Sequence, residues 1–247
     1  MTRDAAFAVE ADNASHVATI RLTNPADGNR LTGDDIVALG RAIREAGSDE
    51  AIKIVVIRAE GEHFCLGRIP NPKGASLPSA LQIQKTVTDP ILGLYADVRA
   101  TPVPVLAVVQ GEARGFGCAF TGQCDLAIAS RRATFSMPEM EVNLPPTLAI
   151  SAVLHKVPLK KLTHMVYTRE SITAEEALTF GLVGELADPG DLDAAASRII
   201  AGLTDRRRAA LRTIKQYLGA APYIDPNAAA RLAEAMLAGI LSSSDEA

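Results

Sequence analysis

The sequence lacks the features that mark several large classes of protein. Lysine and arginine number 25 against 29 aspartates and glutamates, so the net charge of −4 gives no basic excess for nucleic acid. The basic run at 206–208 fits a solvated helix face. No apolar run is long enough to cross a membrane, and the first residues carry no apolar signal segment. We therefore expect no nucleic acid and no membrane among the partners, and a cytoplasmic location.

Cysteine and histidine are also too sparse for a disulfide framework or a metal site. Cys65, Cys118 and Cys124 are odd in number and lie in apolar contexts, so we expect reduced packing residues. A nucleophilic Cys65 would need an activating base, and only His63 lies near it in sequence. The four histidines lack the spacing of metal ligands, so we expect no metal. The glycines at 115–117 lack the third glycine of a dinucleotide fingerprint.

Strands and helices alternate through the first half of the chain. The continuous apolar run at 54–57 is typical of a strand in a parallel sheet that is covered on both faces. Alternation of this kind predicts an α/β fold. The expected strands are 17–22, 54–57, 104–109 and 125–129, and the expected helices are 32–46, 80–99 and one that begins near Gly117.

The C-terminal third is predominantly helical in pattern. A thin boundary near Pro189 and Gly190 divides the chain into a core region, 1–189, and a C-terminal helical region, 190–247. The expected helices here are 149–155, 159–167, 173–180, 192–203, 206–218 and 226–241, with a short strand at 182–186.

Two stretches far apart in the chain place glycine where an apolar run ends. They are residues 63–68 and residues 110–118. Glycine lets backbone N–H groups face a ligand without an obstructing side chain. Two convergent N–H groups can bind the oxyanion that forms when a carbonyl becomes an enolate. Glu139, further along, is a candidate acid or base for the same chemistry.

Together these residues resemble the crotonase superfamily, also called the enoyl-CoA hydratase/isomerase family. No single segment is decisive, but their order and spacing match over almost the whole chain. The matching segments are 22–25 with Asn29 and Leu31, 54–58, 64–67, 102–107, 111–125, 135–139, 172–177 and 181–183.

The resemblance implies a spiral of ββα units followed by helices that mediate contacts in a trimer or a dimer of trimers. It also implies an acyl-CoA thioester as the small-molecule substrate; because the substrate carries coenzyme A, no separate cofactor is expected. The thioester oxygen would accept bonds from the backbone N–H groups of Arg68 and Phe116. The substrate-binding positions implied by the family are Leu66, Gly67, Gly115 and Ala119.

The chain departs from the family at one catalytic position. A typical hydratase has two glutamates; Glu139 falls on one of these positions, and the other is Ala119. The resemblance therefore favours a single-glutamate proton shuttle, as in the enoyl-CoA isomerases of fatty acid metabolism, with hydratase chemistry close behind. A second acid could be Glu112 or Glu141. On an extended segment, Glu141 would point the same way as Glu139.

Two further departures concern the loop after Arg68 and a second catalytic position: the first reshapes the loop, and the second argues against dienoyl-isomerase and aryl-dehalogenase chemistry. Ile69 stands where many relatives have aspartate, and Thr147 stands where some have a catalytic aspartate. The side chains of Arg68 and Lys73 could approach the phosphates of coenzyme A. The acyl group stays open, because Phe116, Phe120, Met137 and Met140 could line an apolar pocket or belong to the core.

Two further classes of function remain. A catalytically silent CoA-thioester binder would keep the fold and the two glycine turns, and Ala119 keeps this reading open. A serine peptidase is the weaker alternative, because Ser136 and Ser151 lack a glycine-rich elbow and a convincing histidine partner.

Overall fold

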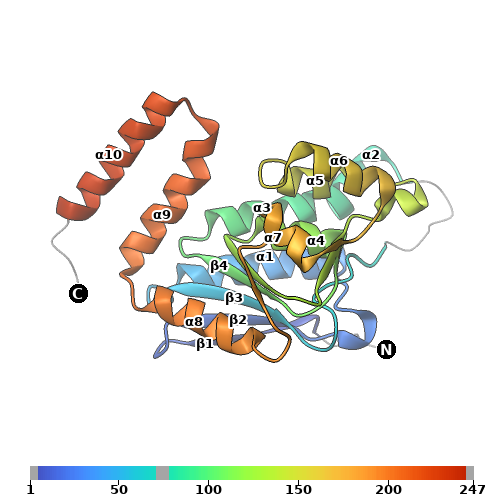
Figure 1. The fold of residues 1–247 in the computed structure, drawn as a ribbon, viewed down its shortest axis with the longest axis horizontal. Coiled ribbons are helices and arrows are strands. Elements are labelled where there is room, and N and C mark those ends of the chain that lie inside the picture. Colours follow the sequence, from blue (N-terminus) through green and yellow to red (C-terminus); the bar gives the residue numbers. More distant parts are fainter. Residues whose placement is uncertain (1–4, 71–77, 243–247) are drawn as a thin grey trace.

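The computed structural model describes residues 5–70 and 78–242, so Lys73 lies outside the described residues. Its largest element is a six-stranded sheet of order β1-β2-β3-β4-β6-β9, in which only the β1–β2 pair is antiparallel (Figure 1). The predicted α/β class is therefore confirmed. The strands are β1 (Phe7–Asp12), β2 (Val17–Leu22), β3 (Ile54–Ala59), β4 (Val105–Val109), β6 (Leu126–Ser130) and β9 (Glu185–Ala187).

The central strands bury both of their faces, as the continuous apolar runs predict. In β3, Val55 and Ile57 point into one hydrophobic cluster, whereas Ile54 and Val56 point into another. Successive side chains of a strand alternate between the two faces of a sheet, so one apolar run supplies both clusters.

The larger cluster lies under α1 (Gly33–Ser48), α3 (Asp89–Ala100) and α4 (Phe116–Gln123). Helix α1 begins where the sequence predicts, because Thr32 and Asp35 form a capping box. The predicted helix 80–99 is present but interrupted by a π-helical turn, η2 (Gln84–Thr88), that follows α2 (Ala80–Ile83). Pro90 has no N–H for the carbonyl of Thr86, which accounts for a change of helical pitch at this point.

A second, three-stranded sheet has the order β5-β7-β8. These strands, together with the edge strand β1, are absent from the sequence-based expectation. They are β5 (Ala113–Arg114), β7 (Thr134–Ser136) and β8 (Ile172–Thr173).

The remaining helices follow the predicted order. Helix α8 packs its buried Leu192 and Ala196 on the second face of the main sheet, so the core extends past residue 190. The assignment of residues 190–247 to oligomerisation stays a prediction. The C-terminal elements are α5 (Thr147–Val153), α6 (Leu159–Thr168), α7 (Ala174–Thr179), α8 (Leu192–Thr204), α9 (Arg208–Ala220), η4 (Ala221–Tyr223) and α10 (Pro226–Ser242).

The basic run at 206–208 is only partly a solvated face. Arg206 and Arg207 are exposed, but Arg208 donates to the backbone oxygens of Gly47 and Ile52 and pairs with Glu50. The expectation was therefore wrong for Arg208, which ties the start of α9 to the end of α1 and the loop that follows it. No helix in residues 5–70 and 78–242 is long and apolar enough to cross a membrane.

Candidate active site

Both glycine turns lie at one edge of the main sheet. Strands β3 and β4 are parallel neighbours, and the turns containing 63–68 and 110–117 each follow the carboxyl end of one of them. Loops after the carboxyl ends of parallel strands meet at the same edge, which is where α/β proteins bind ligands. Residues some 50 positions apart are therefore brought together.

Two buried or half-buried amides hold the first turn in place. Gln110 donates through Nε2 to the carbonyl of His63 at 2.9 Å and to that of Ala59 at 3.1 Å. Asn29 is fully buried and donates through Nδ2 to the carbonyls of His63 and Glu60, both at 2.9 Å. Buried polar side chains rarely lack partners, and here they bind backbone carbonyls at the end of β3 and in the turn that follows it. Both residues lie in stretches that the sequence singles out, but no pattern in the sequence points to this anchoring role.

Backbone contacts join the two turns directly. The N–H of Arg114 donates to the carbonyl of Cys65 at 2.9 Å, and the N–H of Phe64 donates to that of Glu112 at 3.0 Å. A Cβ atom on Gly117 would lie 2.1 Å from the carbonyl oxygen of Cys65. The second turn can approach the first this closely only because residue 117 has no side chain.

At Gly67, which has a φ of +109°, the backbone changes the segment with which it forms hydrogen bonds. Cys65 bonds toward residues 112 and 114, whereas Gly67 accepts at 3.2 Å from the N–H of Leu31 on the other side. Ile69 then donates to the carbonyl of Leu31 at 2.8 Å. Because Leu31 bonds to the residues on either side of Arg68, the N–H of Arg68 is directed away from Leu31, toward the second turn.

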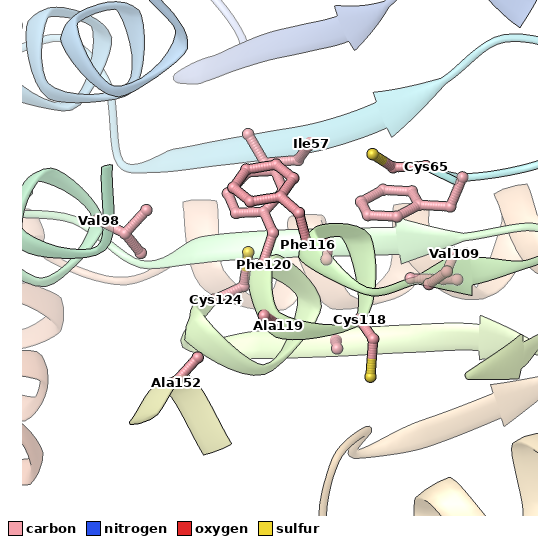
Figure 2. Close-up of a cluster of buried hydrophobic side chains, with 14 of the residues drawn as sticks. Ile57, Cys65, Val98, Val109, Phe116, Cys118, Ala119, Phe120, Cys124 and Ala152 are labelled. Carbon is pink, nitrogen blue, oxygen red and sulfur yellow. The ribbon is translucent and has the colours of Figure 1, made fainter. Parts of the chain in front are cut away.

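Phe116 is the first residue of α4, so its N–H has no acceptor within the helix. Every residue of α4 is buried. The rings of Phe116 and Phe120 stack with centroids 5.9 Å apart on the side of α4 that faces Ile57, whereas the sulfur of Cys118 points from the other side (Figure 2). These two aromatic residues therefore belong to the core and anchor the start of the helix.

The three cysteines are free and buried, as predicted for packing residues. Burial raises the pKa of Cys65 to about 12, which opposes formation of a nucleophilic thiolate.

Glu139 lies beside the start of α4. It begins a short 3₁₀ helix, η3 (Glu139–Val142), that follows β7, and the N–H of Gly115 bonds to the carbonyl of Ser136 at 2.8 Å. The carboxylate oxygen Oε1 is 2.9 Å from the point where a Cβ atom of Gly115 would lie. Its other oxygen, Oε2, is buried without a hydrogen-bond partner, and burial raises the pKa of Glu139. A carboxyl group in this state can exchange a proton near neutral pH more readily than an exposed one.

Glu141 does not share this environment. The expectation that it points the same way as Glu139 assumed an extended segment and was wrong, because the two residues lie in a 3₁₀ helix. Three residues complete one turn of such a helix, so positions two apart face different directions. Glu141 is exposed and its Oε2 lies 2.8 Å from Nη2 of Arg114.

The remaining predicted positions fall in distinct places. Ala119 is fully buried in α4, one helical turn beyond Gly115, and carries no carboxylate. Leu66 is half-buried and packs against Gly28. Glu112 is half-buried and contributes its backbone carbonyl to the contact between the turns. The structure thus brings Gly67, Gly115, Phe116 and Glu139 together, but not Glu141.

A cavity of about 640 Å³ lies at the other end of α4, between the core and α9. Its charged groups already have partners: Lys215 pairs with Asp125 at 2.7 Å, and Lys156 donates to the carbonyl of Gly122. The glycine turns and Glu139 are therefore the better candidate site. Within residues 5–70 and 78–242, no cluster of histidine, cysteine and acidic side chains could hold a metal ion.

The family model for enoyl-CoA hydratase/isomerase matches residues 12–247, which is nearly the whole chain. The chain belongs to the enoyl-CoA hydratase/isomerase family. The crystal structure of an enoyl-CoA hydratase from Mycobacterium smegmatis superimposes with a TM-score of 0.91 at 27% identity, covering 97% of this chain and 92% of that one. The crotonase fold that the resemblance implies is thereby confirmed.

Curated relatives are similar over a shorter stretch. The mouse mitochondrial enoyl-CoA hydratase domain-containing protein 3 is 31% identical over 183 residues, which is 74% of this chain and 60% of that protein. The aligned region thus spans less than two thirds of that relative. The human protein of the same name has a crystal structure that matches with a TM-score of 0.89 at 25% identity, covering 97% of this chain and 93% of that one.

Proposed function

We propose that this protein binds an acyl-CoA thioester and moves a proton on its acyl chain through an enolate. The observation that carries the proposal is the position of the Glu139 carboxylate. Its Oε1 lies 2.9 Å from the point where a Cβ atom of Gly115 would be, and Gly115 directly precedes Phe116, whose N–H begins α4. The thioester oxygen would accept bonds from the N–H groups of Arg68 and Phe116. Coenzyme A arrives as part of the substrate, so the proposal needs no separate cofactor.

The proposed chemistry separates two tasks. The two N–H groups stabilise negative charge on the thioester oxygen, and the positive end of the α4 dipole favours the same charge. Loss of one such donor costs roughly 3 kcal/mol of transition-state stabilisation. Glu139 takes a proton from C2 of a 3-enoyl chain, and the electron pair moves into the enolate. Glu139 then returns the proton at C4, which yields the 2-enoyl isomer.

Isomerisation is favoured over hydration because Ala119 cannot position water. A fully buried methyl group occupies the position where the family's typical hydratase has its other glutamate. Glu141 is paired with Arg114, so its carboxylate is not placed as a ready substitute.

The test is Glu139→Gln, assayed with a 3-enoyl-CoA for isomerisation and a 2-enoyl-CoA for hydration. General acid–base groups contribute about two to four orders of magnitude, so we expect kcat to fall by at least 100-fold. Glu112→Gln is the matched control and should retain most of the activity. Near-parental rates for Glu139→Gln on every acyl-CoA that the parent converts would show that Glu139 is structural.

The alternative is a silent binder of CoA thioesters, and Ala119 is the observation that favours it. Such a protein would bind crotonyl-CoA more tightly than free coenzyme A but convert neither enoyl isomer. Calorimetric titration of the parent with these two ligands, together with the assays above, separates the two functions.

We further propose that the chain assembles as a trimer or a dimer of trimers. Helix α10 has no buried residue, although Leu237 and Leu241 are among its side chains. The helix therefore presents apolar surface for which a second copy of the chain is a suitable cover.

A further inference from the structure

Arg114, the last residue of β5, and Gly115, which follows it, each lie against one of the two glutamates of η3. Gly115 lies against the carboxylate of Glu139, and Arg114 reaches the carboxylate of Glu141 at 2.8 Å. Because Glu139 and Glu141 belong to the same four-residue 3₁₀ helix, the ion pair ties that helix to the strand that leads into α4.

The short helix also packs Met140 against the core and lies against α6. Its backbone closes on itself through bonds from Glu141 to the carbonyl of Pro138, at 2.8 Å, and from Leu144 to the carbonyl of Glu139, at 3.1 Å. These bonds are local and do not set the direction of the helix relative to α4. The ion pair between Arg114 and Glu141 spans 27 positions in sequence and adds a direct contact between this helix and the strand that leads into α4.

We infer that Arg114 is a positioning residue for Glu139, acting through its ion pair with Glu141 and through the positive charge that its guanidinium places near the Glu139 carboxylate. The inference rests on the proposed function of Glu139 as the proton carrier. It assigns Glu141 the part of an electrostatic partner of Arg114 rather than that of a second acid.

The electrostatics at Glu139 have few contributors. Burial raises the pKa of Glu139, and two effects oppose this: first a hydrogen bond to the backbone of Glu139 itself, and then the charge of Arg114. From α3 and α4, Tyr95 and Cys118 are near enough to sense the charge of Glu139; burial raises both their pKa values, that of Cys118 to about 12, so both stay neutral in an ordinary assay.

Helix α6 also lies against η3, and its charged groups are directed elsewhere. Lys161 pairs with Glu176 at 2.9 Å, His164 lies 3.9 Å from Glu170, and Lys160 is exposed. Arg114 and Glu141 are therefore the pair whose removal should alter the protonation of Glu139.

The two halves of the pair should shift that protonation in opposite directions. In Arg114→Gln, Glu139 loses a nearby cation and keeps an unpaired Glu141, so the acidic limb of the kcat/KM profile should move to higher pH. In Glu141→Gln, a repulsive charge disappears and Arg114 is uncompensated, so the limb should move to lower pH. We expect shifts of about half a pH unit, smaller than a buried charge would cause, because both members of the pair are partly exposed to water.

Controls separate charge from packing. Arg114→Lys keeps the cation and should retain the parental limb, and the double variant Arg114→Gln/Glu141→Gln should fall between the two single variants. Arg131→Gln removes an arginine of another exposed ion pair, with Glu175, and should leave the limb unmoved. Shifts in the same direction for both single variants, or no shift with a general loss of rate, would overturn the inference.

A second readout does not depend on turnover. Carbon-13 NMR titration of glutamate-labelled protein, with the Glu139 resonance identified by its loss in Glu139→Gln, reports the protonation of Glu139 directly. Opposite displacements of this resonance support the inference even where the parent converts no acyl-CoA, in which case only the proposed function fails. An unmoved resonance in both variants overturns the inference while the proposed function stands on its own assays.

Discussion

At the scale of single residues, Glu139 occupies a place where ionisation costs the folded state free energy. One carboxylate oxygen is buried without a partner, and burial raises the pKa of the group. The folded protein therefore holds the proton of Glu139 more tightly than the unfolded chain does. The associated stability is fully present below the pKa of the unfolded chain and is lost as pH rises through the pKa of the folded protein.

We therefore predict that Glu139→Gln raises stability at neutral pH while it removes activity. The amide does not ionise, so the variant is spared the cost of charging a buried group, and its gain should be on the order of 1 kcal/mol. Thermal melting of parent and variant between pH 4 and pH 8 checks this, and the two melting curves should converge at the acidic end. A variant that is less stable than the parent at every pH would show that the carboxylate forms stabilising contacts.

The glycines of the site could be predicted from the sequence because their role depends on the conformation of the backbone at the glycine itself. Gly67 and Gly115 end apolar runs, and the structure places both where the turns meet. Arg114 was missed because its partner lies 27 positions away, and because the pairing depends on the 3₁₀ conformation of residues 139–142. An alternating reading of that segment gave Glu141 the wrong direction.

At the scale of elements, α9 is attached to the core through a buried lysine. Lys215 donates to the carbonyls of Val98 and Val103, at 2.8 and 3.0 Å, and pairs with Asp125 at 2.7 Å. Asp125 in turn accepts the N–H of Val105, the first residue of β4, at 2.8 Å. One cation thus links α9 to the end of α3 and the start of a central strand.

We predict that Lys215→Met destabilises the protein by about 3 kcal/mol. Methionine fills a similar volume but leaves two carbonyls and the Asp125 carboxylate without their donor, and breaking a buried pair from one side is costly. The estimate is at the lower end of that range because Asp125 keeps the Val105 bond and some exposure to water. Urea unfolding monitored by circular dichroism measures the loss, with Lys160→Met on α6 as the exposed control. A change below about 0.5 kcal/mol would mean that α9 is held by its apolar contacts alone.

Length and periodicity explain which elements could be predicted. Helices α8 to α10 and strands β3 and β4 lie close to their expected bounds. Each helix is long enough to show several repeats of its apolar spacing, and each of these strands is a continuous apolar run. Strands β5 and β8 have two residues each, which is too short for any periodic signal. Edge strand β1 was missed because its residues beyond Phe7 are exposed, so no buried face marks them.

At the scale of the whole molecule, α9 and α10 project from the core as a helical pair (Figure 1). Large apolar side chains are exposed along both helices and the turn between them. They are Ile214, Leu218, Tyr223, Ile224, Leu237 and Leu241. A run of exposed apolar residues on adjoining elements marks an interaction surface.

We predict that the parent protein behaves in light scattering as a particle of about three or six times the 26.0 kDa chain mass. Leu237→Asp places a charge on the exposed apolar side of α10 and should reduce that mass, because burying an unpaired charge in an interface costs more than the contact returns. Glu234→Ala, on the same helix, is the matched control and should keep the parental mass. Circular dichroism should show an unchanged fold for both variants, since α10 contributes no buried residue to the core of its own chain. A parent that stays monomeric at every concentration would instead assign the exposed side of α10 to a different partner, and Leu237→Asp would then leave the measured mass unaltered.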